Sequence, residues 1–364
     1  MKPIPAIPRI LLGPGPSLVS PRVMRALATP VLGHLDPQLL STMDDVRDAL
    51  RRLFRAPDGS TALAVSGTGT AAMETCLANL VEPGTRMVVV TNGYFGERLA
   101  EIGQRFGAQV HRVAGEWGRA IDPTAVANAI TSNSPQLVAV VHAETSTGVV
   151  NPVEAIAAAA RAKDALVLVD AVTSLGGMPV DVAAWGIDAC YSGSQKCLGA
   201  PSGIAPLVFT PRAWARRVAC RSFYFDLGLL DAYWRERKYH HTIAATLVYA
   251  LAEALAEVED EGLEQRWERH RRHHQSFTSE LAALRLTLLP PEAEQLWTLH
   301  TVVVPDGIDE ASVRRDLREQ YNIEIGAGMG PLAGRVWRIG LMGASSTPSA
   351  IATLVSALST LIRR

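Results

Sequence analysis

The sequence predicts an α/β protein with a large domain built on a mostly parallel seven-stranded sheet and a smaller C-terminal α+β domain. Seven apolar runs between residues 61 and 210 are typical of strands, and stretches with helical periodicity separate several of them. Continuous apolar runs that alternate with helices indicate parallel strands covered on both faces. Beyond residue 242 a long helical pattern leads to two strands around one helix. This change of pattern predicts the second domain.

Composition limits the classes of function. The chain has 364 residues, 48% hydrophobic and 20% charged, so it can bury a large core. A net charge of −1 argues against nucleic acid or an anionic membrane as the main partner. The basic run 267–274 follows acidic residues, and we interpret it as the polar face of a long helix. His240 and His241 are expected to point apart without a third ligand, so we expect no metal site.

The cysteines and the first residues indicate a compartment. Four cysteines (Cys76, Cys190, Cys197 and Cys220) form no CxxC pair, as expected in a reducing environment. The apolar run within residues 1–17 is short and interrupted by prolines, unlike a signal peptide. No apolar run reaches the roughly 18 residues of a membrane span. We therefore expect a cytoplasmic protein.

The individual elements follow from local signals. Two N-terminal helices are predicted over 20–27 and 41–54, with Ser20 and Ser41 as N-caps and Pro21 at the first helical position. The predicted strands are 61–66, 86–91, 109–114, 136–143, 165–172, 187–193 and 204–210, and helices over 69–81, 95–106 and 153–163 lie between several of them.

The second half begins with one long helical pattern over 242–284. Strands over 300–305 and 336–342 then surround a helix over 309–321. We accordingly divide the chain into an N-terminal extension (1–20), a large α/β domain (21–260) and a smaller α+β domain (261–364).

A glycine-rich turn follows the first strand of the large domain. Residues 67–72, GTGTAA, fit the dinucleotide pattern GxGxxA, but the next strand does not end in the acidic residue that holds a ribose. Backbone N–H groups at a helix start, exposed by Gly67 and Gly69, still suit a phosphate. The alternative from this motif alone is a plain glycine turn.

Two charged residues end apolar strands. Asp170 either caps the next turn or forms an ion pair with a buried heteroaromatic cation, and Lys196 lies among small residues where loss of solvation favours its neutral amine. A phosphate cradle, a carboxylate for a pyridinium and an amine for a carbonyl together fit pyridoxal 5′-phosphate (PLP).

The chain resembles a known family over essentially its whole length. The motifs that carry the resemblance occur in order: GPGPS, GHLDP, SGTGTAAME, TNGYFGER, ETSTGVVNP, LVDAVTSLGG, YSGSQKCLGAP, YHHT and RIGLMG. They are similar to those of the class V, fold-type I PLP-dependent aminotransferases, and within them of the alanine–glyoxylate and serine–pyruvate enzymes. The lysine-centred segment and YHHT are specific, whereas SGTG alone is not.

The resemblance implies a role for each matching residue. Lys196 matches the Schiff-base lysine and Asp170 the partner of the pyridine nitrogen. Phe95 stands where relatives often carry a tryptophan stacked on the ring, and Thr70 replaces the histidine of some animal members. The remaining cofactor positions are Thr68, Gly69, Thr145 and Gln195, with Tyr239 and Thr242 of YHHT reaching the phosphate of the neighbouring subunit.

The implied activity is ping-pong transfer of an amino group from alanine or serine to glyoxylate or pyruvate, in a homodimer. Arg338 matches the residue that binds the substrate carboxylate. The first alternative keeps the chemistry with another substrate, such as ureidoglycine or 2-aminoethylphosphonate. The second is a non-catalytic binding protein, against which intact Lys196 and Asp170 argue.

Overall fold

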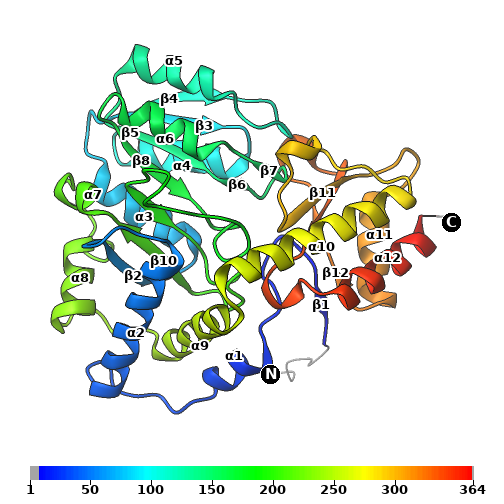
Figure 1. The fold of residues 1–364 in the computed structure, drawn as a ribbon, viewed down its shortest axis with the longest axis horizontal. Coiled ribbons are helices and arrows are strands. Elements are labelled where there is room, and N and C mark those ends of the chain that lie inside the picture. The colour runs from blue at the N-terminus through cyan, green and yellow to red at the C-terminus, as the bar shows by residue number, and fades with distance from the viewer. Residues whose placement is uncertain (1–7, 363–364) are drawn as a thin grey trace.

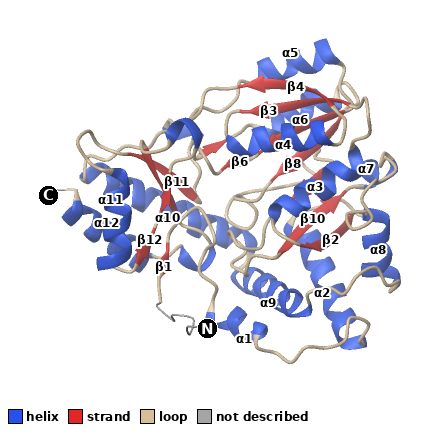
Figure 2. Cartoon of the chain, turned by 180° about the vertical axis from the view of Figure 1, so that it is seen from behind, coloured by secondary structure: helices blue, strands red, loops and turns tan. Residues whose placement is uncertain are grey.

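The computed structural model describes residues 8–362 and confirms the predicted sheet. Seven strands lie in the order β2-β10-β9-β8-β5-β3-β4, and β10 is antiparallel to both of its neighbours. Helices cover the faces of this sheet, and the smaller unit lies beside it (Figures 1 and 2). The strands are β2 (Thr61–Ser66), β3 (Arg86–Thr91), β4 (Gln109–Ala114), β5 (Leu137–Val141), β8 (Leu166–Asp170), β9 (Ala189–Tyr191) and β10 (Ile204–Phe209).

The strands form where their apolar residues are buried. Every residue of β5, β8 and β10 is buried, as expected for central strands covered on both sides. The runs predicted over 136–143, 165–172 and 187–193 form shorter strands. β5 ends before His142, and residues 143–144 pair instead with residues 149–150 in a small hairpin.

Most predicted helices form, with one correction in the first half. α1 (Pro21–Leu27) is capped by Ser20 as predicted. α2 (Pro37–Leu53) was predicted to begin after Ser41, but Asp36 is its N-cap and accepts a hydrogen bond from the Gln38 N–H. Asp36 and Pro37 form the stronger start signal, since proline suits the first helical position. The other helices of the large unit include α3 (Gly69–Leu80), α4 (Tyr94–Arg105), α5 (Pro123–Asn133), α6 (Val153–Arg161), α7 (Pro211–Ala215) and α8 (Leu227–Glu236).

The long helical pattern is divided into two helices. α9 (Ala245–Glu261) and α10 (Leu263–Ala283) meet at Gly262, which has a φ of 83°. Glycine adopts this conformation readily, so the chain changes direction there. The run 267–274 is not simply a polar face, because Trp267, His270 and His274 are buried on one side of α10. Histidine spacing of four residues places both rings toward the interior.

The smaller unit has its own core. Strands β11 (Leu299–Val303), β13 (Gly326–Ala327) and β14 (Val336–Gly340) form an antiparallel sheet, against which α10, α11 (Glu310–Gln320) and α12 (Pro348–Leu361) pack. Figure 1 shows α10 in yellow between the large sheet and this unit.

The N-terminal segment contacts both parts. β1 (Ile10–Leu11) pairs with β12 (Ile323–Glu324) in the smaller unit, and Leu12 is buried in the core of that unit. The sequence predicts an N-terminal extension over 1–20, of which residues 1–7 lie outside the described residues. The chain then passes toward the carboxyl edge of the large sheet. Among residues 8–362, no helix is both long enough and apolar enough to span a bilayer.

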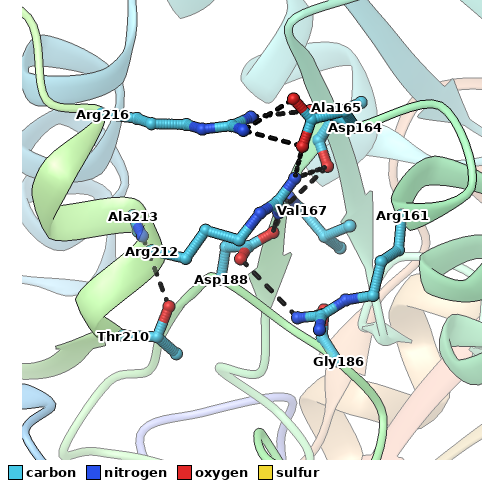
Figure 3. Close-up of polar contacts among 10 residues, drawn as sticks. All are labelled: Arg161, Asp164, Ala165, Val167, Gly186, Asp188, Thr210, Arg212, Ala213 and Arg216. Atoms are coloured by element: carbon cyan, nitrogen blue, oxygen red, sulfur yellow. Dashed lines mark hydrogen bonds and ion pairs between the residues drawn. The ribbon is translucent and has the colours of Figure 1, made fainter.

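An ion-pair network joins strands at the opposite edge of the sheet (Figure 3). Asp188 is fully buried, and its Oδ2 accepts hydrogen bonds from the Val167 N–H at 2.8 Å and from Arg212 at 2.6 Å. Arg212 also contacts Asp164, which is exposed and pairs with Arg216. A buried carboxylate with these partners links β8, the start of β9 and α7.

We predict that Asp188→Ala lowers the free energy of unfolding by about 3–5 kcal/mol, because it leaves Arg212 and the Val167 N–H without their buried acceptor. Chemical denaturation measures the change. Asp164→Ala is the matched control and should cost far less, since water screens that exposed pair. Equal destabilisation by the two variants would contradict a structural role for burial of Asp188.

Candidate active site

A cavity of about 120 Å³ lies where β5 and β8 end and α3 and α4 begin. The carboxyl edge of such a sheet is the usual place for a ligand. Eight residues predicted from the sequence line it: Thr68, Gly69, Thr70, Phe95, Thr145, Asp170, Gln195 and Lys196. Met73, Arg98, Val141 and Val172 complete the lining and were not anticipated.

The start of α3 offers hydrogen-bond donors to this cavity. Its N-cap, Thr68, makes no side-chain capping bond, so the first N–H groups of the helix are not occupied by that hydroxyl. Gly69 packs closely, and a Cβ atom there would lie 3.0 Å from Val172. The side-chain amide of Gln195 also lines the cavity, and its Nε2 can donate a hydrogen bond to an anion. This set of unused polar groups fits an anion bound at the helix start.

Lys196 follows β9 in a loop and is only 8% exposed. Its amine donates a hydrogen bond to the Pro14 carbonyl, so the N-terminal segment covers it. Gly15 has a φ of 120°, and a Cβ there would lie 2.8 Å from Nζ. Burial, assisted by the positive charge of Arg338, lowers the pKa of Lys196 to about 8. A neutral amine is therefore accessible near pH 8, as nucleophilic chemistry requires.

Asp170 ends β8 and is almost completely buried. Oδ1 accepts from the Val172 N–H and Oδ2 from the Tyr191 hydroxyl, both at 2.8 Å. Burial raises the pKa of Asp170 to about 6, although these donors and the charges of Lys196 and Arg98 oppose the shift. A carboxylate held ionised in this setting suits a cationic ring nitrogen.

Arg338 reaches the site from β14 of the smaller unit. It is 8% exposed, and its guanidinium donates to the carbonyls of Ala327 (2.6 Å) and Thr145 (3.3 Å). Burial lowers its pKa to about 10, so it remains charged at neutral pH. No carboxylate of residues 8–362 forms an ion pair with it.

Two predicted residues lie away from the cavity. Tyr239 is 59% exposed, Thr242 is also exposed, and neither lines the cavity within this subunit. The expectation that His240 and His241 point apart was wrong, because their Nδ1 atoms lie 2.7 Å apart. Within the described part of the chain, no group of three or more His, Cys, Asp and Glu side chains could hold a metal ion.

Other residues near the cavity carried weak signals in the sequence. Arg98 is three residues after Phe95, a spacing that shares one helix face. Tyr191 lies inside an apolar strand and gave no signal beyond burial. Glu144 is fully buried, accepts hydrogen bonds from the Phe95 and Gly96 N–H groups, and so fixes the start of α4.

Comparison with known proteins identifies the family. The model of the class-V aminotransferases matches residues 21–336. The chain is a class-V aminotransferase. It is 40% identical to an (S)-ureidoglycine–glyoxylate transaminase of Bacillus subtilis, over 98% of this chain and 91% of the relative. It is also 38% identical to a rabbit (Oryctolagus cuniculus) alanine–glyoxylate aminotransferase, over 98% of this chain and 93% of that one.

A solved structure agrees in fold over the full length. An alanine–glyoxylate aminotransferase from Nostoc sp. superposes with a TM-score of 0.97 at 42% identity, over 100% of this chain and 97% of that one. The fold is therefore that of the fold-type I aminotransferases, as predicted, and these enzymes use PLP. The unused donors at α3, the buried Asp170 and the buried amine of Lys196 fit this cofactor.

We predict that Tyr191→Phe shifts the pH dependence of this aminotransferase. The hydroxyl stabilises the ionised form of Asp170, so its removal raises the pKa of that carboxyl. The acid limb of the pH–rate profile therefore moves to higher pH. Loss of one hydrogen bond to a charged group costs about 1.5–3 kcal/mol, or roughly one to two pH units. The measurement is kcat against pH.

Tyr233→Phe is the matched control. Its buried hydroxyl also donates at 2.8 Å, but to the His34 carbonyl away from the cavity. An acid limb that moves equally in both variants, or in neither, would contradict a positioning role for Tyr191.

Proposed function

We propose that this aminotransferase moves an amino group from alanine or serine to glyoxylate or pyruvate. The observation that carries the proposal is Arg338, a buried guanidinium that makes no ion pair with a carboxylate of residues 8–362 and whose charge acts on the amine of Lys196. A planar fork of N–H donors matches a carboxylate, and a buried cation needs such a counter-charge. An amino acid fits this arrangement if its carboxylate binds Arg338 while its amino group approaches Lys196.

The same arrangement favours short substrates. The sequence offers no second arginine in a comparable motif, so a second carboxylate, as in aspartate or glutamate, lacks an evident partner. Alanine, serine, glyoxylate and pyruvate each carry a single carboxylate and few other atoms.

The residues divide the work. PLP, when bound, supplies the electron sink for the bond that breaks at Cα. Lys196 would anchor the cofactor, and its Nζ, once free, would accept the proton from Cα of the substrate as the general base. Asp170 keeps a proton on the ring nitrogen through its charge. Arg338 fixes the substrate carboxylate, which orients the Cα–H bond toward Lys196.

Ureidoglycine is a second candidate donor. The observation in its favour is the Bacillus subtilis relative, which is named for that substrate and is 40% identical to this chain. Ureidoglycine also has one carboxylate for Arg338. 2-Aminoethylphosphonate lacks a carboxylate, and Arg338 would have to accept a phosphonate instead.

A substrate panel tests these assignments. The purified holoenzyme is assayed with alanine, serine, ureidoglycine, aspartate and 2-aminoethylphosphonate as donors, each against glyoxylate and pyruvate. We expect the highest kcat/KM for alanine or serine with glyoxylate or pyruvate, and no turnover in Lys196→Ala. A higher kcat/KM for ureidoglycine would assign that reaction instead, and turnover by Lys196→Ala would remove the lysine from the mechanism.

We predict that Arg338→Ala lowers kcat/KM for alanine with glyoxylate by roughly two to four decades, because the buried carboxylate loses a charged partner worth about 3–5 kcal/mol. Arg338→Lys should recover only part of this loss, since an ammonium lacks the planar fork. Cofactor absorbance should be unchanged in both. A loss under tenfold, or one explained by cofactor release, would contradict the assignment.

We also propose a homodimer, located in the cytoplasm, with cofactor sites at the subunit interface. Four large aromatic side chains are exposed on one chain, as expected for a surface that a second copy covers: Tyr94, Phe223, Tyr224 and Tyr239. The family resemblance implies that Tyr239 and Thr242 serve the phosphate of the neighbouring subunit. Analytical ultracentrifugation should show an active dimer, and an active cofactor-loaded monomer would contradict the proposal.

A further inference from the structure

The negative charge of the cofactor phosphate needs a positive counter-charge in the protein. A phosphate monoester carries about −1.5 to −2 at neutral pH. The cradle residues Thr68, Gly69, Thr70 and Gln195 are all neutral, and a helix N-terminus supplies roughly half of one positive charge. A buried anion without a compensating cation is costly. The site therefore needs a further positive charge near α3.

Two cations line the cavity, Lys196 and Arg98. Lys196 is committed to the carbonyl end of the cofactor. Arg338 lies outside this lining and donates to carbonyls at the boundary with the smaller unit, where the substrate carboxylate is expected. Arg98 therefore remains as a cation of the lining that has no role in the proposed amino-group transfer.

Arg98 contacts the cradle directly. Its Nη1 donates a hydrogen bond to the Thr70 hydroxyl at 3.0 Å. No ion pair joins Arg98 to a carboxylate of residues 8–362, and the adjacent Glu97 pairs instead with Arg112 at 3.0 Å. The positive charge of Arg98 also acts on Asp170, whose pKa it lowers.

Arg98 also contacts the aromatic wall of the cavity. The guanidinium carbon lies 4.9 Å from the centroid of the Phe95 ring and 5.1 Å from that of Tyr94. These distances are within the range of a cation–π interaction. One side chain thereby ties the start of α3, through Thr70, to the start of α4, through Phe95.

We propose that Arg98 is a positioning residue that supplies the counter-charge for the cofactor phosphate through the Thr70 hydroxyl. The charge of Arg98 lies next to the Thr70 hydroxyl. It makes the electrostatic potential at the start of α3 more positive, which strengthens binding of the phosphate there. The inference rests on the PLP dependence of the family and not on which amino donor the enzyme uses.

Equilibrium binding to the apoenzyme tests the proposal without reference to activity. PLP is compared with pyridoxal, which has the same ring and aldehyde but no phosphate. Arg98→Gln should weaken PLP binding by about tenfold to a hundredfold, the range for losing one hydrogen bond to a charged group. It should leave pyridoxal binding within threefold of wild type. Inorganic phosphate should raise the melting temperature of the wild-type apoenzyme more than that of the variant.

Two further variants keep the test specific. Arg112→Gln removes the same formal charge from the partner of Glu97, at an exposed site outside the cavity lining, and should bind PLP like wild type. Arg98→Lys retains the charge and should recover most of the preference for PLP over pyridoxal. If Arg98→Gln fails to fold, Arg98→Met replaces it, because it removes the charge while keeping an unbranched apolar side chain against Phe95.

Three outcomes would overturn the proposal. They are unchanged PLP affinity in Arg98→Gln, equal losses for PLP and pyridoxal, and a PLP preference in Arg98→Lys as low as that of the glutamine variant. The second outcome would leave Arg98 with a purely structural role at Phe95. None of these readouts depends on alanine or glyoxylate, so a failure of the proposed substrate would be recognised separately.

Discussion

The site depends on burying charged groups at the carboxyl edge of a parallel sheet. Asp170 is held at the end of β8, where desolvation raises its pKa to about 6 and two hydrogen bonds from Val172 and Tyr191 oppose that rise. The balance between burial and these two hydrogen bonds thus sets the pH at which the carboxylate ionises. The same environment lowers the pKa of Lys196 to about 8. Burial moves the two pKa values toward each other, so a poised acid and a poised amine coexist near neutrality.

The smaller unit is joined to this edge by hydrogen bonds to backbone carbonyls. The Gly340 N–H donates to the Leu12 carbonyl at 2.8 Å, and the Thr298 hydroxyl donates to the Thr173 carbonyl at 3.0 Å. The first contact links β14, which carries Arg338, to the segment that passes over Lys196. The second links the start of β11 to the loop after Asp170. Small displacements of the smaller unit would therefore move the substrate-binding arginine relative to the lysine.

The local sequence predicted much of this fold because its signals are local. A run such as residues 204–209 is apolar throughout, and its short length between a glycine and a proline favours a strand buried on both faces over a helix. Ser20 before Pro21 likewise identified the start of α1. The start of α2 was misplaced because Asp36, followed by Pro37, carries the same kind of N-cap signal five residues earlier than Ser41. The break at Gly262 was missed because the helical periodicity continues on both sides of it.

For the site, the sequence by itself determined the chemical types: a lysine among small residues, an aspartate closing a strand and a glycine turn before a helix. Those features follow from spacing along the chain. Only the tertiary structure decided which other groups act on them. The hydroxyl of Tyr191 meets Asp170 from the neighbouring strand, and Arg98 meets Thr70 across two helix starts. Residues so distant along the chain come together only through strand order and packing, which no local pattern records.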